Sequence, residues 1–183
     1  MKASRAVSQI LVLATVLIAA WTMQAAATGI KHAPAKHAPA KIVRVLAANP
    51  AAPLATAVIV PAGAKMYYLS GVIPDVADAS APQGSAQSYG DTTTQVASVL
   101  AKVKVTLASL GLTFAEVVQA HVFLAGDPAK NGDMDFAGLN AAWLKEFGTA
   151  TQPNKPARVT VKVAGLAAPG ALVEIEFVAA KIK

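Results

Sequence analysis

The sequence predicts an α+β fold in which two helices pack on one face of a mixed β-sheet. Two segments carry apolar residues at helical spacing, and several shorter segments alternate between polar and apolar residues as strands do. The helical segments lie between strand-like ones, in the order ββαβαββ, which favours parallel strands joined by helical crossovers with hairpins at both ends. Residues 45–183 carry ten basic and ten acidic side chains and suffice for one domain with its own core.

The first 27 residues have the features of an export signal. Lys2 and Arg5 precede an apolar run over residues 10–21, and small residues follow at 25–27. The run is shorter than the roughly 20 apolar residues that span a bilayer. We therefore expect a cleavable signal peptide over residues 1–27 and a periplasmic or secreted protein with no stable membrane insertion; a retained anchor is the alternative.

Residues 28–51 are predicted to form a flexible basic leader, in which the sequence KHAPA occurs twice. His32 and His37 could share a metal ion, but no acidic or cysteine ligand accompanies them, so we favour a solvated tail and expect no metal site. Once the signal is removed, the basic excess lies in this leader and residues 52–183 are neutral, which argues against a nucleic-acid partner. The chain has no cysteine, which excludes disulfides and thiol chemistry.

The first two strands are expected at residues 57–61 and 66–71, joined as a hairpin by the turn residues 62–64. The segment 74–91 is rich in Ser, Ala, Gly and Pro and shows no periodicity. It is predicted to be a loop, and loops of this length are often functional or mobile.

Two amphipathic helices are predicted. The first begins at Asp91 or Thr92, ends at Gly111, and carries an apolar stripe made of Val96, Val99, Leu100, Val103, Leu107 and Leu110. The second covers residues 136–148 and ends at Gly148; its buried stripe is expected to consist of Phe136, Leu139, Trp143 (or Leu144) and Phe147.

A strand through Leu124 follows a short turn at Thr113 and Glu116, which have capping-box spacing. His121 lies inside this strand. Nothing near it in the sequence pairs with it, so we interpret it as structural rather than catalytic. Residues 125–135 form a second predicted loop.

The last two strands alternate strictly between valine-type and polar residues. Arg158 and Thr160 alternate with valines, and Glu174 and Glu176 alternate with apolar residues after an Ala-Pro-Gly turn. We expect these four polar residues on the sheet face that the helices leave open. Because that face is otherwise rich in Ala and Val, it favours association between copies of the chain, which would enclose the polar groups between subunits.

Several segments together resemble the RidA/YjgF family of reactive intermediate deaminases, also called L-PSP. They are "YYLSGVIP", "EVVQAHVFLAG", "MDFAGLNAAW" and "PARVTVKVAGLAAPGALVEIEFVA", in this order and spacing, and the resemblance defines a RidA-like domain over residues 52–183. It implies a chorismate mutase-like fold and a homotrimer with a barrel-like core and a ligand cleft at each subunit interface. It also implies cofactor-free hydrolysis of enamines and imines, such as 2-aminoacrylate, to 2-keto acids and ammonia.

The resemblance assigns two catalytic residues. Arg158 matches the arginine that clamps the substrate carboxylate, a task that suits its planar fork of donors. Glu174 matches the glutamate that positions or activates the attacking water. A carboxylate suits this role because it can accept a proton and return it. Without the family match, a simple pairing of Arg158 with Glu174 across neighbouring strands is the alternative.

The resemblance also assigns four substrate-binding positions. Ser70 and Gly71 match the residues that line the family's substrate cleft, and Asn140 matches the asparagine of its "DFAxxN" segment. Thr160 falls where the family presents a backbone amide to the substrate carboxylate. For Asn140, a role as a helix cap or interface residue stays open. For Gly71, relief of crowding at a strand end stays open.

The sequence also departs from the family pattern. The usual "GPYSQ"-type segment has no counterpart in "AAPLATAVIV", so a cleft aromatic is missing unless Tyr67, Tyr68 or Tyr89 supplies it. The loops at 74–91 and 125–135 look longer than in compact members. Three functions therefore remain: an exported deaminase acting on a carboxylate-bearing imine, a non-catalytic module that binds small carboxylates or proteins, and a ribonuclease. The neutral domain and the lack of a histidine pair argue against the last.

Overall fold

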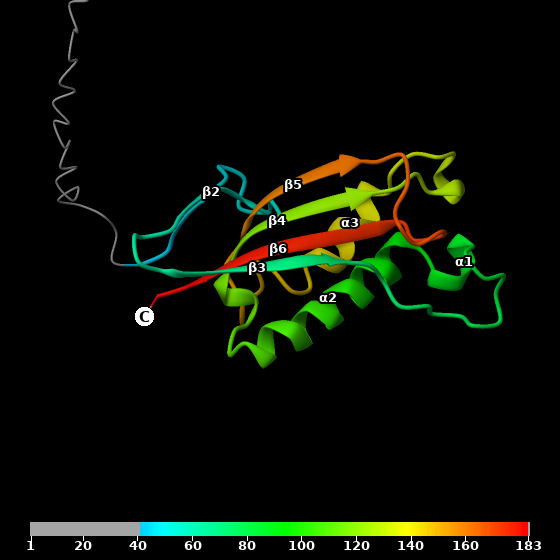
Figure 1. The fold of residues 1–183 in the computed structure, drawn as a ribbon. Helices are drawn as coiled ribbons and strands as arrows, with labels where there is room; N and C mark the ends of the chain where they lie inside the picture. The colour runs from blue at the N-terminus through cyan, green and yellow to red at the C-terminus, as the bar shows by residue number, and fades with distance from the viewer. Residues whose placement is uncertain (1–40, 183) are drawn as a thin grey trace, which may run out of the picture. The chain divides into compact units, whose positions relative to one another are not determined.

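The computed structural model describes residues 41–182 (Figure 1). In chain order the elements are β1 (Val43–Leu46), β2 (Ala55–Ile59), β3 (Lys65–Val72), α1 (Ala86–Tyr89), α2 (Thr92–Ser109), the 3₁₀ turn η1 (Phe114–Glu116), β4 (Val117–Leu124), the 3₁₀ turn η2 (Pro128–Lys130), α3 (Phe136–Trp143), β5 (Ala157–Lys162) and β6 (Val173–Lys181).

Four strands form the main sheet, in the order β3-β6-β4-β5. β4 and β5 are parallel and are connected through α3, while β6 is antiparallel to both of its neighbours, β3 and β4. β1 and β2 form a separate antiparallel pair. The prediction of an α+β fold with a mixed sheet and helical crossovers is therefore confirmed.

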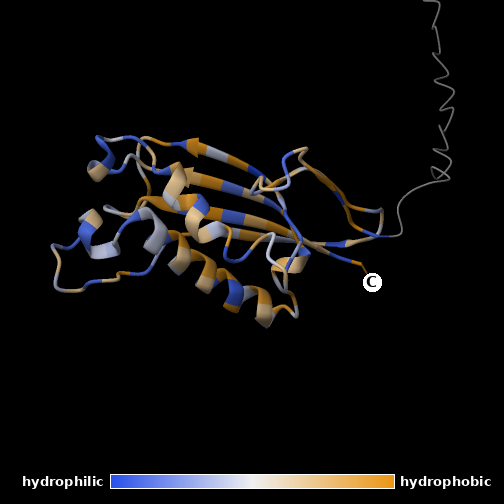
Figure 2. Ribbon diagram, turned by 180° about the vertical axis from the view of Figure 1, so that it is seen from behind, coloured by the Kyte–Doolittle hydropathy of each residue, from blue (hydrophilic) through white to orange (hydrophobic). Residues whose placement is uncertain are grey.

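The two long helices, α2 and α3, lie on the same face of this sheet, as Figures 1 and 2 show from opposite sides. The inward-facing residues of the sheet, such as Val122, Ile175 and Phe177, pack against the buried stripes of the helices. Trp143 and Phe147 stack with ring centroids 4.3 Å apart and extend the core at the end of α3. The opposite face of the sheet has no helix over it within residues 41–182.

Local capping residues in the sequence correctly predicted where α2 and the turn η1 begin. The side chain of Asp91 accepts a hydrogen bond from the Thr94 amide at 2.7 Å and caps α2, and the predicted capping box of Thr113 and Glu116 is present. The second helix is shorter than predicted, because α3 ends at Trp143 and turns follow it.

Two positions of the predicted stripes are exposed: Phe136 at the start of α3 is 43% exposed and Leu110 after α2 is 45% exposed. Both lie at a helix end, beyond the reach of the sheet's core. The other predicted stripe positions, apart from the optional Leu144, are buried.

The predicted hairpins are wrong. β2 pairs with β1 rather than with β3, and β4 lies between β5 and β6. β6 has four fully or nearly fully buried side chains on one face, Val173, Ile175, Phe177 and Ala179. This apolar face favours a central place in the sheet, so β6 sits between β3 and β4 although its sequence neighbour is β5.

The expected leader is also shorter than predicted, because β1 lies within it. The Arg44 guanidinium donates to the carbonyls of Ala115 and Val117 at 2.7 and 3.1 Å, and Lys155 donates to the carbonyls of Pro50 and Ala52. These bonds attach residues 43–52 to the domain. The signal peptide, the KHAPA repeat and both leader histidines lie outside the described residues, and none of the helices within 41–182 has the length and apolarity to cross a membrane.

Candidate functional site

Arg158 and Thr160 lie on the helix-covered side of the sheet, which corrects the expectation that they face the open side. They are in register with Ala120 and Val122 of β4, whose side chains are buried under the helices. β5 is an edge strand, and the inward side chain of Arg158 contacts α3. That helix offers aromatic rings and one side-chain amide at this point. These groups suit a guanidinium better than the valines of β5, which had been expected to face the helices.

The guanidinium of Arg158 is held by three residues of α3. Its Nη2 donates to Asn140 Oδ1 at 2.8 Å. Its central carbon lies 4.7 Å from the ring centroid of Trp143 and 5.6 Å from that of Phe136, within the range of cation–π attraction. The two aromatic neighbours were not among the predicted site residues, although their spacing from Asn140 along one helix face could have revealed them.

Several polar atoms at this point have no hydrogen-bond partner. They are Nε and Nη1 of Arg158 and the hydroxyl oxygen of Thr160, all buried. None of the ion pairs formed within residues 41–182 involves Arg158. Burial lowers the pKa of Arg158 to about 10, so the group is still cationic at neutral pH. Arg158 thus carries a partly desolvated positive charge for which residues 41–182 provide no counter-ion.

Glu174, Ser70 and Gly71 lie together on the open face of the sheet. The register of β3 and β6 shifts between Leu69 and Val72, and Ser70 and Gly71 occupy this irregularity. A Cβ atom at position 71 would overlap the carboxylate of Glu174. The absence of a side chain at Gly71 therefore makes room for the Glu174 carboxylate, which connects the two explanations considered for this glycine.

The sequence indicated no partner for His121, but the structure shows two. Its Nδ1 contacts the carboxylate of Glu176, and its Nε2 lies 2.8 Å from the side-chain nitrogen of Gln119. This arrangement fits an imidazole that donates from Nδ1 to the carboxylate and accepts the Gln119 amide at Nε2. His121 lies opposite Glu176 because β4 pairs with β6. The contact could not be predicted without knowing this strand order, which the sequence alone does not reveal.

The predicted site residues thus form two groups on opposite faces of the sheet. Arg158, Thr160 and Asn140 lie on the helix side, and Ser70, Gly71 and Glu174 lie on the open side. A pairing of Arg158 with Glu174 across neighbouring strands is excluded, because β5 borders β4 and not β6. Asn140 is not the cap of α3 either, since Asp135 fills that position.

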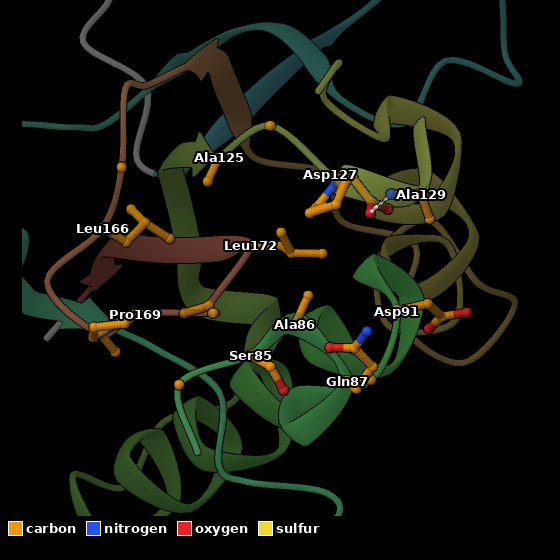
Figure 3. A pocket seen from close by; sticks show the side chains of 18 residues that line it. Ser85, Ala86, Gln87, Asp91, Ala125, Asp127, Ala129, Leu166, Pro169 and Leu172 are labelled. Atoms are coloured by element: carbon orange, nitrogen blue, oxygen red, sulfur yellow. Dashed lines mark hydrogen bonds between the residues drawn. The ribbon is translucent and has the colours of Figure 1, made fainter. Parts of the chain in front are cut away.

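A cavity of about 840 Å³ lies where the two long loops meet the turn before β6 (Figure 3). None of the predicted site residues lines it. Its acidic side chains are engaged locally, because Asp127 accepts from the amide of Ala129 and Asp91 caps α2. The size of this cavity comes from the loops, and no side chain in it is poised for acid–base chemistry. Within residues 41–182 no three metal-ligating side chains cluster.

The fold is that of a small α+β protein, and at one edge of its sheet a partly buried arginine pairs with no carboxylate of residues 41–182. Residues 45–181 match the family model described as Endoribonuclease L-PSP, and the chain belongs to this family, which includes the YjgF and RidA proteins. The resemblance seen in the sequence is therefore confirmed, and the match takes in residues 45–51, which had been placed in the leader.

Individual relatives agree with this assignment. The protein DfrA of Myxococcus xanthus is 37% identical over 128 residues, covering 69% of this chain and 84% of DfrA. The YjgF gene product of E. coli is 30% identical with a TM-score of 0.50, covering 67% of this chain and 85% of that structure. TdcF of E. coli, solved with bound serine, is 27% identical with a TM-score of 0.50 and the same coverage.

Proposed function

We propose that the protein is an exported enamine/imine deaminase, which hydrolyses reactive imino acids to 2-keto acids and ammonia without a cofactor. The observation that carries the proposal is the guanidinium of Arg158, which is partly buried and pairs with no carboxylate within residues 41–182. A buried charge is stable only when it finds a partner. A substrate carboxylate supplies that partner, and the hydroxyl of Thr160 beside it has a free hydrogen-bonding capacity.

The chemistry needs one further acid–base group. Glu174 takes a proton from a water molecule as the water oxygen adds to the carbon of the C=N bond. The same proton is returned to the nitrogen, which gives a carbinolamine. Glu174 then carries the remaining hydroxyl proton to the nitrogen, the C–N bond breaks, and ammonia leaves as the C=O bond forms. Ser70 and Gly71 line the site beside Glu174.

Because Arg158 and Glu174 lie on opposite faces of the sheet, the proposed site is formed by two copies of the chain. The β5 edge of one subunit, with Arg158, meets the open sheet face of another, with Glu174. Val159 and Val161, which are 47% and 41% exposed on that open face, support such a contact. The assembly proposed is the homotrimer that is typical of the family.

Two observations support the substrate class and the location. TdcF of E. coli was solved with bound serine, a small amino acid whose carboxylate is of the kind that Arg158 would hold. The apolar run at residues 10–21 and the small residues after it support export and removal of a signal peptide. An exported enzyme that oxidises amino acids or amines would be a natural source of imines.

The alternative is a non-catalytic module that binds small carboxylates or proteins. The missing cleft aromatic favours it. Of the three candidate replacements, Tyr67 packs against the core, Tyr89 is half-buried in α1, and only Tyr68 is on the open face, where it is 79% exposed. The description of the family model as an endoribonuclease adds RNA cleavage as a further outcome to test.

The test is the release of ammonia and keto acid from enzymatically generated 2-aminoacrylate and from larger imino acids. Residues 28–183 are compared with Arg158→Ala and Glu174→Gln variants, and a single-stranded RNA is included as a second substrate. We expect hydrolysis by the unmodified chain and a loss of at least about 100-fold in each variant. Binding of pyruvate without turnover would leave the binding module, and cleavage of RNA would replace the proposal.

A further inference from the structure

Arg158 is held in place by side chains that carry no charge. Asn140 accepts its hydrogen bond at 2.8 Å, and the rings of Trp143 and Phe136 lie on its guanidinium. These three residues are spaced at positions i, i+4 and i+7 of α3, so they form one stripe along the helix. The stripe orients the guanidinium and leaves its positive charge uncompensated.

The stripe is itself fixed in position. The indole nitrogen of Trp143 donates to the carbonyl of Pro53 at 2.8 Å, which sets the plane of the ring that faces Arg158. The Asp135 side chain caps the first turn of α3 through the amide of Gly138. Asn140 lies between these two attachment points, so its amide oxygen is presented to β5 by a rigid helix.

A carboxylate in place of the Asn140 amide would have the opposite electrostatic effect. It would form a partly buried ion pair with Arg158, and such pairs hold both partners strongly because neither can return to water easily. The guanidinium would then have a permanent counter-ion inside its own chain. A substrate carboxylate would have to compete with that internal counter-ion.

We propose that Asn140 is a positioning residue, which orients Arg158 through a neutral hydrogen bond and thereby keeps the arginine's charge available for the substrate carboxylate. This inference rests on the proposed function. It differs from the expectation that Asn140 contacts the substrate, because it assigns Asn140 an effect through Arg158 alone. Its specific requirement is an uncharged acceptor at position 140.

The test compares Asn140→Asp and Asn140→Ala with the unmodified protein. The measurements are the Kd for pyruvate by calorimetry, the kcat and KM for 2-aminoacrylate, and the Tm. For Asn140→Asp we expect weaker pyruvate binding and a higher KM, each by at least about tenfold, with kcat changed less than about threefold and Tm unchanged or raised. For Asn140→Ala we expect a smaller rise in KM together with a lower Tm, because the hydrogen bond is lost.

Ala141→Asp is the matched control, since Ala141 is exposed on the same helix and receives the same added charge. It should leave both KM and the Kd for pyruvate unchanged. A double-mutant cycle adds the decisive comparison. In an Arg158→Ala background, Asn140→Asp should cause no further loss of pyruvate binding, because the group through which Asn140 acts is gone.

Three results would overturn the inference. They are unchanged pyruvate binding in Asn140→Asp, a fall in kcat without a change in KM, and an effect of Asn140→Asp that persists in the Arg158→Ala background. A protein that binds pyruvate but turns over no imine removes the proposed deaminase and leaves Asn140 testable through Kd. A protein that does not bind pyruvate at all removes both proposals.

Discussion

Gly71 is the residue at which one added methyl group should most affect catalysis. A Cβ there would overlap the Glu174 carboxylate, so Gly71→Ala must displace the proposed general base. We expect kcat for 2-aminoacrylate to fall at least about tenfold, while the Kd for pyruvate changes less because the variant keeps the arginine that holds the carboxylate.

Gly165→Ala is the matched control for this variant, because a Cβ at position 165 meets no atom within 4 Å. It should leave kcat unchanged. An unchanged kcat in Gly71→Ala as well would mean that the observed place of the Glu174 carboxylate is not needed for turnover.

Arg158 makes carboxylate binding dependent on pH at the alkaline end. Burial lowers its pKa to about 10, and only the protonated guanidinium attracts a carboxylate. The Kd for pyruvate should be flat from neutral pH to about 9 and should rise above about pH 10, approaching tenfold per pH unit. Calorimetry at several pH values, with circular dichroism to verify the fold, measures this. A loss of affinity already between pH 7 and 9 would contradict it.

The same lowered pKa affects folding in the opposite direction: high pH weakens carboxylate binding but raises the contribution of Arg158 to the free energy of unfolding. An unfolded arginine keeps its proton to a higher pH than the buried Arg158 does, so the unfolded chain binds more protons than the folded one over an interval that begins near pH 10 and ends at the ordinary pKa of arginine. The contribution of Arg158 to the free energy of unfolding therefore rises with pH through that interval. Below it the buried charge opposes folding by a constant amount.

The residue types of the candidate site were readable from the sequence, but the side of the sheet that each occupies was not. The alternation of residues along a strand predicts that Arg158 and Val159 face opposite sides of the sheet. It does not state which side meets a helix, because that depends on where α3 lies. For the same reason the contact between His121 and Glu176 was missed, although both had been assigned to strands.

β1 is the element in which the structure departs most from a solvated leader. It is a four-residue strand whose only partner strand within residues 41–182 is β2, and such a short pair is marginal without further attachment. Arg44 supplies the attachment through its bonds to the carbonyls of Ala115 and Val117.

Arg44→Ala should therefore lower the free energy of unfolding by about 1–3 kcal/mol. Chemical denaturation measures the effect. Lys41→Ala, a change of an exposed basic residue two positions before β1, should have no comparable effect. Equal stability of both variants would show that the bonds of Arg44 are not what holds β1 to the domain.

The limits of helices were easier to predict from the sequence than the pairing of strands. The limits of α2 follow from local chemistry, since Asp91 caps its start and Gly111, with φ +69°, follows its end. Strand pairing is decided by contacts between residues far apart in the chain. The turn at 62–64 indicated a hairpin, yet β3 instead pairs with β6, from more than 100 residues later, because β6 has the most buried face.

For the whole molecule, the separation of Arg158 and Glu174 predicts complementation between inactive variants. Neither Arg158→Ala nor Glu174→Gln should be active alone. If each site takes its arginine from one subunit and its glutamate from another, mixed assemblies contain some sites with both native residues. Co-refolding the two variants at equal amounts should then restore roughly a quarter of the activity per site, whatever the number of subunits in the closed ring.

Light scattering establishes the assembly size, and the activity of the mixture is followed as ammonia release. Mixing Arg158→Ala with the Arg158→Ala/Glu174→Gln double variant is the control and should restore nothing, because no native arginine is present. A site contained within one chain would always keep one defect, so an inactive mixture of correctly assembled variants would contradict the shared site. Partial recovery would instead explain why Arg158 has no counter-ion among residues 41–182 of its own chain: its partner is a substrate held against the neighbouring subunit.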